Sequence, residues 1–204
     1  MPFPILHCAL SAQPNSREAS PASSCAVPLS RHAIFFSVAT FGCALDLWTK
    51  HWIFQWPRGP GQRGEWWLIE GYVGIQQAVN TGALFGMGQG QTILFAALSV
   101  VAVLGILCWL FIARAARDLT LTIALGCVMG GILGNLYDRL GLWGGRGRDG
   151  QPLYAVRDWI LLCYGQYTWP NFNIADCLLV CGAGLLAWHA LAHQESPSPP
   201  KTPA

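Results

Sequence analysis

Charged side chains stand in or beside stretches of the sequence that are otherwise apolar. Asp46 and Lys50 lie within the first such stretch, Asp138 and Arg139 end a later one, and Asp176 stands near the start of the last. An ionisable group in a membrane-length apolar segment is energetically expensive, so these residues are candidates for function.

The spacing of these residues indicates shared helix faces. Three pairs are three or four residues apart, as neighbours on one helix face are: Asp46 with Lys50, Asn135 with Asp138, and Asn173 with Asp176. Such groups could simply pair to hold helices together. All of them fall at the same end of their segments, however, and we favour a polar site just inside the membrane surface.

Serine and metal chemistry fit this pattern poorly. Ser99 lies in the middle of its segment, at the wrong depth to pair with Lys50. His189 and His193 have the spacing of a zinc-protease motif, but Ala190 stands where that motif has Glu. They also lie at the far end of their segment, where we expect a solvated helix end.

Carboxylates are the chemistry that remains. Two neighbouring carboxyl groups in a site of low dielectric do not both ionise easily, so they share one proton. The ionised group can take a proton from water while the protonated group polarises a carbonyl, as in aspartic proteases.

Four apolar segments must position these groups. A helix of about 20 residues crosses a bilayer core of about 30 Å, and the segments have about that length: 33–54, 92–113, 119–137 and 174–192. The composition agrees, because only 11% of the residues are charged against about 25% in soluble domains. The net charge of +2 does not indicate nucleic acid as a partner.

Two long connections, 57–91 and 140–171, lie on one side of the expected bundle, and a tight turn at 114–118 lies on the other. Residues 66–69 and 72–75 indicate short strands, and the Gly- and Arg-rich run at 141–150 indicates a flexible loop. Trp48, Trp52 and Trp56 recur every four residues and should stripe one helix face as part of an aromatic belt. The positive-inside rule does not set the orientation, because one side carries five Lys and Arg residues and the other carries seven.

The sequence divides into a flexible tail at 1–30, a four-helix membrane domain at 31–193 and a Pro-rich tail at 194–204. We interpret most of the eight cysteines as small apolar residues rather than as a disulfide framework.

Five motifs, in order along the chain, resemble those of the lipoprotein signal peptidases (signal peptidase II). They are Asp46-Leu47-Trp48-Thr49-Lys50, Asn80-Thr81-Gly82-Ala83-Leu84-Phe85-Gly86, the run from Gly130 to Arg139, Val156-Arg157-Asp158-Trp159, and Phe172-Asn173-Ile174-Ala175-Asp176. Two departures occur: Trp159 stands where the family usually has Phe, and the stretch from Arg139 to Val156 is longer than expected.

The resemblance implies that Asp158 and Asp176 form the catalytic pair. The residues alone favour Asp138 over Asp158, because Asp158 falls in an expected loop; the resemblance leaves Asp138 with Arg139 as a supporting pair. The other residues implied to build the site and hold substrate are Asp46, Lys50, Asn80, Gly82, Asn135, Asn173 and Ala175.

The resemblance also implies an all-α membrane protein with four transmembrane helices and a small periplasmic β-sheet between the first two. The family consists of inner-membrane aspartic peptidases with both termini in the cytoplasm. They remove the signal peptide from prolipoproteins just before a cysteine that bears diacylglycerol. We therefore expect prolipoproteins and membrane lipid as partners, a monomer, no nucleic acid, and neither cofactor nor metal.

Three other readings stay open on the residues. A small proton-coupled transporter would use the same carboxylates as a relay, although such sites commonly lie at mid-membrane in repeated folds and no repeat is evident. A non-catalytic scaffold would tolerate isosteric changes of the aspartates. A presenilin-like protease would also use two aspartates, and Tyr137-Asp138 fits its first motif, but no Gly-x-Gly-Asp follows.

Overall fold

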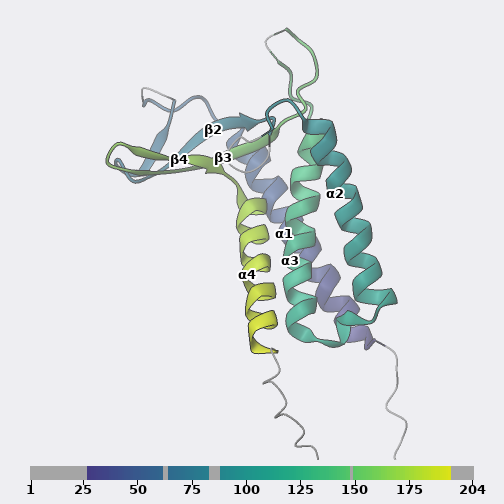
Figure 1. Cartoon of the computed structure of the whole chain (residues 1–204). Coiled ribbons are helices and arrows are strands. Elements are labelled where there is room, and N and C mark those ends of the chain that lie inside the picture. Colours follow the sequence, from purple (N-terminus) through teal and green to yellow (C-terminus); the bar gives the residue numbers. More distant parts are fainter. Residues whose placement is uncertain (1–26, 62–63, 83–87, 148, 194–204) are drawn as a thin grey trace, which may run out of the picture.

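The computed structural model describes residues 27–61, 64–82, 88–147 and 149–193. Most of the two predicted tails, together with Ala83 to Gly86 of the second motif, lie outside this part. Within the described residues, four long helices run side by side and a β-sheet lies across one end of them (Figure 1). The helices are α1 (Leu29–Ile53), α2 (Thr92–Leu107), α3 (Leu119–Arg139) and α4 (Ile174–Ala192).

The predicted apolar segments are confirmed as helices that are long and apolar enough to cross a membrane. A π-helical turn, Cys108–Ile112, extends α2, and a 3-10 turn, Ala115–Arg117, leads into α3. The start of α1 and the end of α4 lie at the end of the bundle away from the sheet (Figure 1). Large apolar side chains cover the outer helix surface, among them Phe41, Ile93, Val101, Ile112, Val180 and Leu191. Such a surface suits a hydrocarbon environment better than water.

Side-chain caps begin α3 and α4. Asp118 accepts a hydrogen bond from the backbone N–H of Leu121 at 2.8 Å. Asn173 and Asp176 form a capping box, in which each side chain accepts from the other residue's backbone N–H. The predicted pairing of Asn173 with Asp176 is therefore confirmed.

Glycines let α3 pack closely against α1 and α4. A Cβ at Gly131 would lie 2.5 Å from the carbonyl oxygen of Ala175 in α4, and one at Gly134 would collide with the carboxylate of Asp46 in α1. Only a residue without a side chain allows these approaches. The helices that carry the polar residues are thus held together at the level of those residues.

The sheet is larger than expected. Its four antiparallel strands, within the described residues, run in the order β1 (Trp66–Ile69), β2 (Val73–Asn80), β3 (Val156–Tyr164), β4 (Tyr167–Phe172). The predicted strands at 66–69 and 72–75 are confirmed in β1 and β2. The expectation that Asp158 lies in a loop is wrong, because β3 pairs with β2 and places Asp158 opposite Ala78.

The Gly- and Arg-rich run projects beyond the helix ends (Figure 1). It is held by an isolated bridge between Arg146 and Pro152 and by a hydrogen bond of 2.9 Å from Arg146 to the carbonyl of Gly150. The predicted tryptophan face is also confirmed, since Trp48 stacks on Trp52 and Trp56 meets Trp52 edge to face.

Candidate active site

A buried lysine gathers polar groups from two helices at the sheet end of the bundle. The ammonium nitrogen of Lys50 lies 2.7 Å from Asp46 Oδ2 and 3.2 Å from Asp138 Oδ2. It also donates a hydrogen bond of 2.9 Å to Asn135 Oδ1. All three charged side chains are fully buried. The predicted ion pair of Asp46 and Lys50 is confirmed, and Lys50 ties α1 to α3.

A buried arginine, Arg157, joins Asp46, Lys50 and Asp138 in one ion network. Arg157 was not among the predicted site residues. Arg157 in β3 donates to Asp138 Oδ1 from Nη2 at 2.7 Å and from Nε at 3.0 Å, and its backbone N–H binds Asp138 Oδ2 at 3.0 Å. The guanidinium also faces the rings of Trp143 and Phe54. Asp138 and Arg139, the two adjacent residues expected to support the site, thus have different partners. The sequence does place Arg157 next to Asp158. Its burial could not be predicted, because the segment was expected to be a loop.

Asn173 joins the two carboxylates that the resemblance selects. Its side-chain nitrogen donates to Asp158 Oδ1 at 2.6 Å, and its side-chain oxygen accepts from the backbone N–H of Asp176 at 3.0 Å. The backbone N–H of Asn173 donates to Asp176 Oδ2 at 3.1 Å. A single fully buried residue at the start of α4 thus contacts both carboxyl groups, that of Asp158 through its side-chain amide and that of Asp176 through its backbone N–H.

Two further contacts attach α4 to the ion network. Asn135 donates to Asp176 Oδ1 at 3.0 Å. The backbone N–H of Ala175 donates to Asp46 Oδ1 at 2.9 Å. Asp46 therefore serves both Lys50 and the first turn of α4, which explains why a fully buried Ala175 belongs to the cluster.

The end of β2 forms another side of the site. Asn80 is opposite Val156 in the sheet, and its side-chain oxygen accepts from the backbone N–H of Gly82 at 2.9 Å. Arg139 Nη2 donates to the carbonyl of Gly82 at 3.4 Å, and its guanidinium lies over the ring of Phe95. Arg139 thus holds the β2 end rather than Asp138.

Asp158 has an unusual protonation equilibrium. Burial, and to a lesser extent the negative charge of Asp176, raise the pKa of this carboxyl to about 7. Hydrogen bonds from Asn173 and Asn80 and the charge of Lys50 oppose the shift without cancelling it. Asp158 therefore keeps its proton at pH values where an ordinary Asp carboxyl has lost it.

A cavity of about 330 Å³ adjoins both carboxylates. Its polar lining includes Asn80, Asn135, Arg139, Asp158 and Asp176. Its apolar lining continues along α3 and α4 through Ile132, Leu179, Val180 and Ala183. Asp138 does not line it. The cavity can thus hold a polar reacting group at one end and an apolar group at the other.

The structure brings together all of the residues that the sequence analysis selected: Asp46, Lys50, Asn80, Gly82, Asn135, Asp138, Arg139, Asp158, Asn173, Ala175 and Asp176. Asp158 and Asp176 face the cavity, whereas Asp46 and Asp138 neutralise buried cations. Two carboxyl groups in unequal surroundings beside one cavity can act as acid and base on a bound water.

Comparisons with known proteins identify what the chain resembles. A family model described as signal peptidase (SPase) II matches residues 38–192. A lipoprotein signal peptidase of Rhodopirellula baltica is 56% identical over 162 residues, which cover 79% of this chain and 73% of that protein. Another, of Clostridium novyi, is 32% identical over 152 residues, covering 74% of this chain and 92% of that protein.

A solved structure shares the fold. It is a bacterial membrane enzyme determined by the in meso method at 2.3 Å resolution, with a TM-score of 0.65. The match covers 83% of this chain and 95% of that one at 24% sequence identity.

Proposed function

The chain belongs to the signal peptidase II family, and on that premise we propose that it is an intramembrane aspartic endopeptidase. It removes the signal peptide from diacylglyceryl-modified prolipoproteins and cleaves before the lipidated cysteine. One observation carries the proposal: the carboxyl groups of Asp158 and Asp176 both accept hydrogen bonds from Asn173 and line the same cavity.

The different surroundings of the two carboxyl groups support a division of roles between them. Asp176 is in the first turn of α4, where the helix dipole favours an anion, and it accepts hydrogen bonds from Asn135 and the backbone of Asn173. Asp158 is desolvated, and its pKa is raised to about 7. Asp176 is therefore the ionised base, and Asp158 carries the shared proton.

These roles define a reaction in which protons balance. Asp176 takes a proton from water while the water oxygen attacks the peptide carbonyl carbon, and Asp158 gives its proton to the carbonyl oxygen. Asp176 then protonates the leaving nitrogen, and Asp158 recovers a proton from a hydroxyl of the tetrahedral intermediate as the C–N bond breaks. Both groups return to their starting states.

The shape of the cavity fits a lipid-bearing substrate. Its apolar lining along α3 and α4 accommodates acyl or leucine-rich segments that arrive from the bilayer, and the polar end receives the peptide bond. We place the protein in the bacterial inner membrane as a monomer. The sheet and the catalytic dyad, Asp158 and Asp176, face the periplasm, and both termini lie in the cytoplasm.

A proton-coupled transporter is supported less well. The buried charges lie near the end of α1, at the end of α3 and in β3, beside the sheet, whereas relay sites in transporters commonly lie near the bilayer midplane. Only a peptidase would release a cleaved precursor, and that product can be measured.

The proposal is tested with purified protein in detergent and two forms of one prolipoprotein, with and without diacylglycerol on the cysteine. We expect cleavage of the lipidated form alone, and mass spectrometry should find the lipidated cysteine at the new N-terminus. No cleavage, or a cut elsewhere in the precursor, would overturn the proposal.

A further inference from the structure

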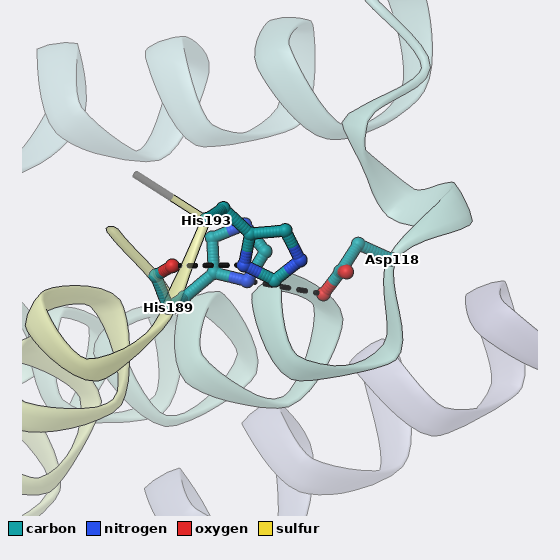
Figure 2. A group of neighbouring side chains, drawn as sticks. All are labelled: Asp118, His189 and His193. Atoms are coloured by element: carbon teal, nitrogen blue, oxygen red, sulfur yellow. Dashed lines mark hydrogen bonds and ion pairs between the residues drawn. The ribbon is translucent and has the colours of Figure 1, made fainter. Parts of the chain in front are cut away.

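A second polar cluster lies at the other end of the helices, away from the dyad. Asp118 caps the start of α3, and His189 and His193 stand one helical turn apart at the end of α4. The two imidazoles lie beside the Asp118 carboxylate (Figure 2), with ring centroids 4.1 Å apart. One ligand atom from each residue lies within 4.8 Å of the other two, and the part of the chain that the structure describes contains no other such group.

The hydrogen bonds of the cluster leave ligand atoms available. His193 Nδ1 lies 2.9 Å from the carbonyl oxygen of His189. When Nδ1 carries the proton and donates it there, the Nε2 lone pair is free, as in metal-binding histidines oriented by a backbone carbonyl. His189 Nδ1 is shielded from water and has no hydrogen-bond partner among the described residues. Its nearest charged neighbour is Asp118 Oδ1, at 3.7 Å.

The Asp118 carboxylate is held in place independently of the histidines. Its Oδ1 accepts the hydrogen bond from Leu121 that begins α3. The spacing of the two histidines along the chain predicted only a solvated helix end. The third member comes from a different helix, so the spacing along the chain does not show it.

We propose that Asp118, His189 and His193 bind a divalent transition metal ion of the zinc class and thereby join the end of α4 to the start of α3. Two imidazoles and one carboxylate are a common protein donor set for zinc, with water in the fourth position. Imidazole nitrogen favours such ions over Mg²⁺ and Ca²⁺, which prefer oxygen.

The ligand atoms lie farther apart than they would around a bound ion. Ligand atoms about 2.1 Å from a tetrahedral zinc ion are roughly 3.4 Å from one another, so the observed separations must shorten. His193 is exposed and can turn, whereas the His189 and Asp118 side chains are partly buried, with 18% and 35% of their surface accessible. The two partly buried residues form the fixed side of the site.

The test measures Zn²⁺ binding to the full chain, without a polyhistidine tag, by competition with a chromophoric chelator. We expect one Zn²⁺ per chain and no competition by Mg²⁺. His189→Ala and His193→Ala should weaken binding at least about tenfold. Asp118→Asn should also weaken it, although Asn still caps a helix. His51→Ala, which alters an exposed histidine at the dyad end, should bind as the wild type does.

A second measurement separates binding from loss of fold. Zn²⁺ should raise the unfolding temperature of the wild type and of His51→Ala, but not that of His189→Ala, because only a ligand of the folded state stabilises it. Equal Zn²⁺ affinity in the wild type and His189→Ala would overturn the proposal and leave an ion pair of His189 with Asp118. The result is independent of peptidase activity, because the cluster lies at the opposite end of the bundle.

Discussion

Asp158 and Asp176 share one amide but not one environment. Asp158 is desolvated on a strand, whereas Asp176 is in the capping box of a helix. In the proposed mechanism, this difference in environment makes Asp158 the acid and Asp176 the base. In the sequence, Asp176 stands out as a charge in an apolar segment, whereas Asp158 is selected only by the family resemblance.

The raised pKa of Asp158 predicts how activity depends on pH. Activity needs one protonated and one ionised carboxyl, and Asp158 loses its proton as the pH rises through about 7. We therefore expect kcat/KM to fall on the alkaline side, approaching about tenfold per pH unit. A pH–rate profile measures this, and a rate that stays constant to pH 9 in a folded enzyme would contradict it.

The raised pKa of Asp158 also predicts how the stability of the fold depends on pH. The folded state holds the Asp158 proton at pH values where the unfolded chain, with an ordinary Asp pKa near 3.8, has lost it. Raising the pH from about 4 to 7 should therefore lower the free energy of unfolding in wild type but less so in Asp158→Asn.

Asn173 offers a test of positioning. Asn173→Ser keeps a side chain that caps α4 but removes the amide N–H that binds Asp158. We expect kcat/KM to fall roughly 10- to 100-fold, the scale of a lost supporting hydrogen bond, with little change in unfolding temperature. Asn173→Ala should lose both activity and stability, because the cap goes as well. Full activity in Asn173→Ser would show that the amide does not position the dyad.

At the residue scale, most of the site follows from the sequence, because ionisable groups in apolar segments are visible there. Asp46, Lys50, Asp138 and Asp176 were selected on that basis. Asp158 and Arg157 were not, because their burial depends on β3 pairing with β2, which lies far away along the chain.

Strand β3 connects the ion network to the dyad. Consecutive residues in a strand point to opposite faces, so Arg157 reaches Asp138 while Asp158 reaches the cavity and Asn173. The adjacent motif residues therefore have different tasks. The ion network holds β3 in place through Arg157, and β3 in turn positions Asp158, the proposed acid.

Arg157→Gln should destabilise the protein by about 3–5 kcal/mol, because it leaves a buried carboxylate without one of its two cations. Thermal unfolding in detergent measures the change. Arg146→Gln in the projecting loop removes an exposed arginine and should alter stability by less than about 0.5 kcal/mol. Equal effects of the two changes would contradict a structural role for the Arg157 ion pair.

Close packing of α3 on α4 predicts a second effect at the scale of elements. Gly131→Ala places a Cβ against the Ala175 carbonyl and should cost about 1–3 kcal/mol of stability, with some loss of activity because Ala175 precedes Asp176. Gly105→Ala in α2 is the matched control, since a Cβ there meets nothing within 4 Å. If Gly131→Ala is as stable as Gly105→Ala, the helices do not depend on this contact.

The helices were predictable because each is a long apolar run, and their bounds differ from the expected ones by a few residues. Half of the sheet was not. β3 and β4 contain Arg157, Asp158 and several polar residues, and they follow a glycine-rich stretch, so no simple alternation marks them as strands. Pairing with β2 overrides that weak local signal.

The whole molecule is polarised along the bundle axis. The sheet lies at one end, and the first and last helical residues lie at the other (Figure 1). The ion network and the cavity are at the end with the sheet. Four apolar segments with two long connections on one side predicted this arrangement. The cluster of Asp118 with two histidines was not predictable, because it forms only when α3 and α4 pack together.

The central claim is that Asp158 and Asp176 carry the chemistry. The most direct measurement is the rate at which purified wild type, Asp158→Asn and Asp176→Asn cleave a diacylglyceryl-modified prolipoprotein, with Asp149→Asn in the projecting loop as the control and folding checked for each. We predict that both dyad variants lose at least about 10²- to 10⁴-fold in rate while Asp149→Asn cleaves as the wild type does. A folded Asp158→Asn enzyme with wild-type activity would contradict the account.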